Sequence, residues 1–109
     1  MSLVTEITKH LQEKTVFRDD LFEGENILIV GATGGIGLAV SCLLKRLGAN
    51  LMLVARKEDR LSKIAGCLET VGAGEILFSK IDVRDLEQVE ALFRGRLDLQ
   101  LFDSVVNCA

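Results

Sequence analysis

Four short apolar runs alternate with three segments of helical periodicity between residue 26 and the end of the chain. In chain order they are residues 27–30, 35–47, 51–54, 58–71, 76–78, 86–93 and 104–106. Runs that are apolar throughout are typical of strands covered on both faces, and Gly48 and Gly72 follow the first two helical segments as helix ends. Strands that alternate with helices at these intervals predict βαβ units, and right-handed crossovers then give the parallel strand order 3-2-1-4. This is half of a doubly wound α/β sheet.

Residues 1–24 have a different pattern. Val4, Ile7 and Leu11 recur at helical spacing, and polar residues lie between them. This pattern predicts a short amphipathic helix that docks through a few apolar side chains. We therefore divide the chain into a helical extension, residues 1–24, and a sheet-forming half-domain, residues 25–109.

A glycine-rich turn, residues 31–37, leaves the first apolar run and enters the first helical segment. Glycines permit the tight reversal and let a pyrophosphate approach the main chain, while the helix N-terminus presents unpaired N–H groups to it. The Gly-Lys-Ser/Thr ending of a P-loop is absent from this turn. The turn therefore predicts a Rossmann-type dinucleotide site. Its expected ligands are Gly31, Thr33, Gly34, Gly35, Ile36 and Gly37.

The chain resembles the short-chain dehydrogenase/reductase family over residues 26–109. Its glycines fit the family's G-x-x-x-G-x-G turn, and three further segments match in the same order. Residues 54–56 are similar to the end of the second strand, residues 81–83 to the Asp-Val step beside the adenine, and residues 106–109 to the start of the Asn-Asn-Ala-Gly motif. The resemblance implies four more cofactor contacts, at Asp82, Val83, Asn107 and Ala109.

Two departures leave the branch of the family open. Gly31, Gly34 and Gly37 also fit the G-x-x-G-x-x-G turn of the extended branch, which includes sugar-nucleotide epimerases and dehydratases. Asn107 favours the shorter, reductase-like branch. Cys108 stands where the second Asn is usual, and we interpret it as a thiol buried in a strand.

The end of the second strand indicates which nicotinamide cofactor is preferred. NAD-binding folds place an acidic residue there, whereas this chain has Ala55 and Arg56. A guanidinium binds a 2′-phosphate that a carboxylate would repel, so we predict NADP(H) rather than NAD(H). A second basic residue is usual where Gly34 stands, so Arg56 would act with Lys57 or Arg60. The alternative is that Arg56 is a solvated loop residue paired with a neighbouring carboxylate.

The family's catalytic Tyr-x-x-x-Lys pair has no counterpart, because the chain contains no Tyr. We therefore assign no catalytic residue and expect the 109-residue chain alone to be inactive. The resemblance implies hydride transfer between NADP(H) and a small carbonyl or alcohol substrate in a complete enzyme. The chain stops inside a motif, which favours the N-terminal part of such an oxidoreductase. The alternative is a self-standing, non-catalytic NAD(P)-binding module.

Composition excludes several partners. A net charge of -3 argues against nucleic acid, and three scattered cysteines form neither a disulfide framework nor a metal site. We find no apolar run that could span a membrane and no export signal, so we expect a cytoplasmic protein.

The last strand is expected at one edge of the sheet, although it is apolar enough for a covered position. It would therefore promote self-association unless residues 1–24 fold over it, with Asp98 and Asp103 giving little protection.

Overall fold

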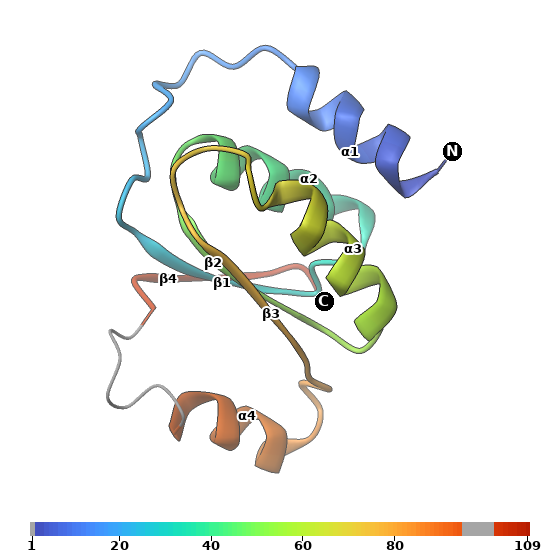
Figure 1. Cartoon of the computed structure of the whole chain (residues 1–109). Helices are drawn as coiled ribbons and strands as arrows, with labels where there is room; N and C mark the ends of the chain where they lie inside the picture. The colour runs from blue at the N-terminus through green and yellow to red at the C-terminus, as the bar shows by residue number, and fades with distance from the viewer. Residues whose placement is uncertain (1, 95–101) are drawn as a thin grey trace.

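The computed structural model describes residues 2–94 and 102–109. Its strands form one parallel sheet in the order β3-β2-β1-β4, as predicted (Figure 1). The strands are β1 (Asn26–Val30), β2 (Asn50–Ala55), β3 (Ile76–Lys80) and β4 (Ser104–Asn107). The predicted half of a doubly wound α/β sheet is thereby confirmed.

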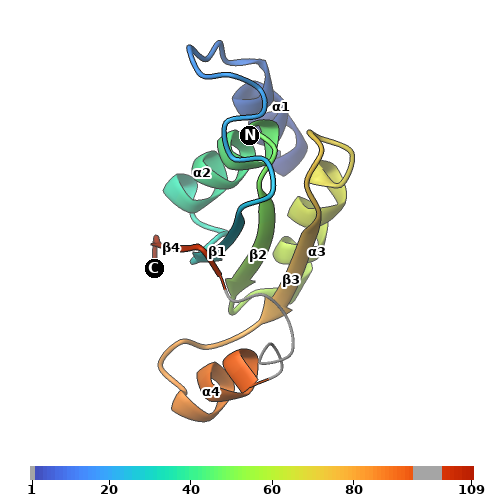
Figure 2. The ribbon, with the colours of Figure 1, turned by 90° about the vertical axis from the view of Figure 1, so that its left-hand side faces the viewer.

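The helices form two layers on one face of the sheet and one on the other (Figures 1 and 2). They are α1 (Leu3–Gln12), α2 (Gly35–Arg46), α3 (Glu58–Leu68) and α4 (Leu86–Arg94). α2 and α3 lie against one face, and α1 packs on the outside of both. α4 lies on the opposite face. The predicted N-terminal helix is therefore present and docked.

Alternate side chains of the two central strands enter two separate cores. Ile27 and Ile29 of β1 pack with the residues of α1, α2 and α3, whereas Leu28 packs on the other face with Val54 and Ile81. Each of these side chains is almost completely buried. Because a strand turns successive side chains to opposite faces, the uninterrupted apolar run satisfies both cores at once.

Of the two glycines predicted to follow helix ends, only Gly48 does so. Gly48, with φ of 95°, follows the C-cap of α2 as expected. α3 ends at Leu68 rather than Val71. Beyond this end, the Val71 carbonyl accepts a hydrogen bond from the buried ammonium of Lys45 in α2.

Within the described part of the chain, no helix combines the length and the apolar character needed to cross a bilayer.

Candidate functional site

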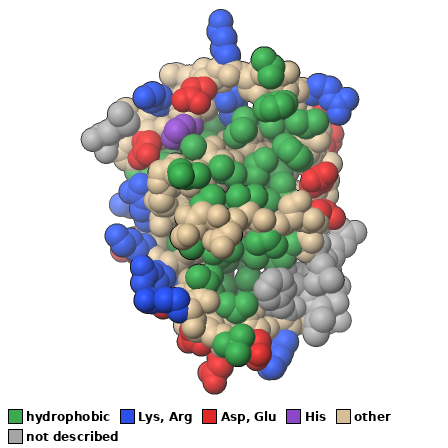
Figure 3. Space-filling model, turned by 180° about the vertical axis from the view of Figure 1, so that it is seen from behind, with side chains coloured by type: hydrophobic (Ala, Val, Ile, Leu, Met, Phe, Trp, Pro, Cys, Tyr) green, Lys and Arg blue, Asp and Glu red, His purple; other side chains and the backbone are tan. Residues whose placement is uncertain are grey.

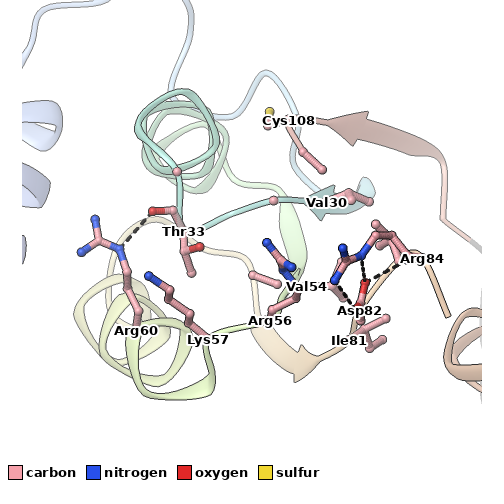
Figure 4. A pocket seen from close by; sticks show the side chains of 15 residues that line it. Val30, Thr33, Val54, Arg56, Lys57, Arg60, Ile81, Asp82, Arg84 and Cys108 are labelled. Atoms are coloured by element: carbon pink, nitrogen blue, oxygen red, sulfur yellow. Dashed lines mark hydrogen bonds and ion pairs between the residues drawn. The ribbon is translucent and has the colours of Figure 1, made fainter.

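An open pocket of about 590 Å³ lies at the carboxyl ends of β1, β2 and β4 (Figure 4). Its volume is within the range of small-molecule sites. The carboxyl end of a parallel sheet is also where doubly wound folds bind ligands, because the strand order reverses there. Eight of the predicted site residues line it: Gly31, Thr33, Gly34, Ala55, Arg56, Asp82, Val83 and Ala109.

The glycine turn is shaped by close backbone contacts at its two ends. Gly31 has φ of 78°, and a Cβ there would lie 2.7 Å from the backbone nitrogen of Ala109. A Cβ at Gly37 would lie 2.2 Å from the Gly31 carbonyl oxygen. Any side chain at either position would therefore push the turn apart. A Cβ at Gly35, by contrast, meets nothing within 4 Å.

The N-terminus of α2, which follows the glycine turn, has no side-chain cap. Gly34 is the N-cap residue and has no side chain to accept from the first turn of the helix. The first N–H groups of a helix have no partner within it, and they carry the positive end of the helix dipole. This end of α2 therefore suits an anion.

Three cations line the pocket near the end of β2. Arg56 and Lys57 follow β2 and are exposed, and Arg60 comes from the first turns of α3. Figure 4 shows Arg56 in the middle of the pocket. In the described residues, Arg56 forms no ion pair with Glu58 or Asp59. Its charge also contributes to lowering the pKa of Asp82 at the pocket.

The loop after β3 brings a carboxylate and a guanidinium together. Arg84 donates from Nε and from a terminal nitrogen to the Asp82 carboxylate, at 3.1 and 3.0 Å. These side-chain bonds, and then the Arg84 backbone N–H, lower the pKa of Asp82 from 3.8 to about 2. Sequence reasoning missed Arg84, which lines the pocket beside Asp82. The only available signal was its position two residues after Asp82.

Four predicted residues lie outside the pocket lining: Gly35, Ile36, Gly37 and Asn107. Gly37 packs against the turn instead, and Ile36 is 74% exposed. The Asn107 side chain accepts the Ala109 N–H at 3.1 Å and so folds the chain beyond β4.

Cys108 was expected to be buried in a strand, and this is wrong. It follows β4, is half-buried and lines the pocket, because β4 ends at Asn107.

The model of the family described as short chain dehydrogenase matches residues 25–109. The chain belongs to the short-chain dehydrogenase/reductase family. It is 34% identical over 87 residues to a short chain dehydrogenase/reductase of Macrophomina phaseolina, covering 79% of this chain and 50% of the relative. It is also 36% identical to a 3beta-hydroxysteroid dehydrogenase of Mediterraneibacter gnavus, covering 72% and 30%. This short-chain dehydrogenase/reductase chain thus spans half or less of the length of these relatives.

Among solved structures, this family member is similar to L-sorbose reductase from Gluconobacter frateurii, which was crystallised with NADPH and L-sorbose. The TM-score is 0.75 at 33% identity, with 84% of this chain and 35% of the reductase covered. The fold of the short-chain dehydrogenase/reductase family binds NAD(P)(H). Among the described residues, no three His, Cys, Asp or Glu side chains are grouped so as to hold a metal ion.

Proposed function

We propose that this chain is the NADP(H)-binding part of an oxidoreductase that transfers hydride between the cofactor and a small carbonyl or alcohol substrate. One observation carries the proposal: Arg56 lies exposed at the end of β2 and forms no ion pair with Glu58 or Asp59. A guanidinium there would form charged hydrogen bonds with a 2′-phosphate. The NADPH held by the related L-sorbose reductase supports the proposal.

The rest of the pocket fits the adenosine half of such a cofactor. The N-terminus of α2 and the glycine turn would hold the pyrophosphate through backbone N–H groups. Asp82 and Val83, beyond β3, would lie beside the adenine, and Ala55 would flank the ribose. When bound, the cofactor supplies the hydride, and the residues of this chain bind and orient it.

Titration of wild-type protein and Arg56→Ala with NADPH and NADH tests the cofactor assignment. Wild type should bind NADPH about 10- to 150-fold more tightly, because a charged hydrogen bond contributes about 1.5–3 kcal/mol. Arg56→Ala should largely remove this difference while leaving NADH binding unchanged. Lys63→Ala, an exposed cation of α3 outside the pocket, is the control. Equal wild-type affinities for both cofactors would contradict the assignment.

Catalysis is a separate question, because the family's proton donor is a tyrosine and this chain contains none. We expect the purified 109-residue chain to bind NADPH without reducing ketones or oxidising alcohols above background. The alternative function is a self-standing, non-catalytic NAD(P)-binding module, and the lack of Tyr fits either function, because the family's Tyr lies beyond the fourth strand. The short chain dehydrogenase description of the matching family model supports the reductase-like branch over the extended one. Steady turnover of a ketone or an alcohol would contradict the expected inactivity.

A further inference from the structure

One side chain connects α1 with the pocket, although α1 lies outside residues 25–109 that match the family model. Arg60 of α3 lines the pocket. Its Nε donates to the Thr33 carbonyl in the glycine turn at 3.0 Å, and a terminal nitrogen lies 3.8 Å from a carboxylate oxygen of Glu6 in α1. A single guanidinium therefore bridges the N-terminal helix and the turn that faces the pocket.

The position of Glu6 is set by specific packing of α1 rather than by a loose contact. Ile7, the next residue, is 1% exposed and belongs to the same core cluster as the buried residues of α2 and α3. At the other end of α1, the Arg46 guanidinium of α2 donates to the His10 carbonyl at 3.1 Å. These two contacts hold α1 in place, so Glu6 is presented to Arg60 at a defined site.

The Glu6–Arg60 pair changes the charge available near the end of β2. Three cations line this side of the pocket, yet the guanidinium of Arg60 is used by Thr33 and Glu6. Figure 4 shows Arg60 at the rim beside Thr33, whereas Arg56 lies in the middle of the pocket. The side chains of Arg60 and Glu6 are only 37% and 30% exposed, so water screens the pair incompletely. Glu6 thus restrains Arg60 and offsets its charge.

We propose that Glu6 is a specificity-determining residue that acts through Arg60, so that α1 limits how strongly the pocket prefers adenosine phosphates that carry a 2′-phosphate. The proposal rests on the NADP(H) assignment given above. Without the Glu6 charge, the guanidinium keeps its bond to the Thr33 carbonyl at the pocket, and its positive charge, no longer offset, adds to the attraction for a 2′-phosphate. A ligand that lacks this phosphate gains little from the change.

The test measures the binding of 2′,5′-ADP and 5′-AMP to the full 109-residue chain by calorimetry. These probes differ only in the 2′-phosphate. Glu6→Gln keeps the shape of the side chain and removes its charge. It should raise the affinity for 2′,5′-ADP about two- to fivefold relative to 5′-AMP, the range expected when a partly exposed ion pair is released. Glu6→Asp, which withdraws the carboxylate by one methylene, should give a smaller increase in the same ratio.

Two control variants separate this effect from a general change of charge or fold. Glu13→Gln removes an exposed carboxylate of the same region that lies beside His10 rather than Arg60, and it should leave the ratio unchanged. In an Arg60→Gln background, Glu6→Gln should no longer raise the ratio.

An unchanged ratio in Glu6→Gln, an equal rise in Glu13→Gln, or a rise that persists without Arg60 would overturn the inference while leaving the NADP(H) assignment standing. A wild type with no preference for 2′,5′-ADP would overturn both.

Discussion

The glycines of the turn have different structural roles, although they form one motif in the sequence. Gly31 and Gly37 are required by contacts within the chain, since a Cβ at either would lie within 3 Å of backbone atoms. Gly35 has open space where its Cβ would be, so its lack of a side chain serves no packing purpose. Gly35 also lies outside the lining of the pocket.

This difference predicts opposite results for two alanine variants in the same helical turn. Gly37→Ala should lower the free energy of unfolding by about 1–3 kcal/mol, because the new methyl group is forced against the Gly31 carbonyl. Gly35→Ala should change it by less than about 1 kcal/mol, in the stabilising direction, since alanine favours the helix. Urea denaturation followed by circular dichroism measures the stability of both variants. A Gly37→Ala variant as stable as Gly35→Ala would contradict the geometry.

Asp82 predicts a specific dependence of stability on pH. Its pKa is about 2 in the folded protein, below the ordinary 3.8, because Arg84 donates to its carboxylate. The stabilisation from this pair is therefore fully present above about pH 4 and is lost as the pH falls toward 2. Asp82→Asn should be less stable than wild type at pH 7, and this difference should shrink between pH 4 and pH 2. Glu69→Gln, which alters an exposed carboxylate at the C-cap of α3, should show no such convergence. A stability difference that is the same at pH 2 and pH 7 would exclude this role for the pair.

At the scale of elements, the sequence predicts the order and type of every helix and strand that the structure describes. Helical periodicity and continuous apolar runs are enough for this prediction. The strands at the centre of the sheet are buried on both faces and are therefore apolar throughout. The boundaries are less accurate. α3 ends three residues before the predicted Val71, whose carbonyl accepts a hydrogen bond from Lys45 of α2, and no local pattern contains this tertiary contact.

The residues of the candidate site are also predictable only in part. Residues attached to a strand end or to the glycine turn, such as Gly31 and Arg56, are predictable because the topology brings strand ends together. Arg84 and the Glu6–Arg60 pair could not be predicted from the sequence. Arg84 carries no motif, and Glu6 reaches Arg60 only because α1 docks on α3. Contacts between separately predicted elements are thus the part that sequence periodicity leaves undetermined.

For the whole molecule, the arrangement of strands leaves β4 at one edge of the sheet. β4 pairs with β1 on one side, and no other strand of the described residues lies on its far side. Val105 is 56% exposed. Figure 2 places β4 on the side of the molecule that Figure 3 presents, and apolar side chains gather across that side. α1 does not cover this edge, because it packs on α2 and α3.

The two edges of the sheet differ in their protection. β3, at the opposite edge, contains Lys80, and a charged residue discourages pairing with another chain. β4 contains no charged residue. The Asp103 carboxylate beside it is engaged by the Asn26 N–H at 2.8 Å, and Asp98, the other charge expected to guard this edge, lies outside the described residues. β4 is therefore the edge at which association between copies should begin.

We predict that the 109-residue chain self-associates through β4 and that Val105→Lys reduces this association. The substitution places a charge on an exposed edge position and should leave the fold intact, since Val105 is more than half exposed. Light scattering over a range of protein concentrations measures the effect. Leu77→Lys is the matched control, because Leu77 is 49% exposed on the edge strand β3, where Lys80 already supplies a charge. Val105→Lys should delay the rise in apparent mass to higher concentration, whereas Leu77→Lys should follow the wild type. A wild-type chain that stays monomeric at high concentration, or an equal response of the two variants, would show that β4 is not the associating edge.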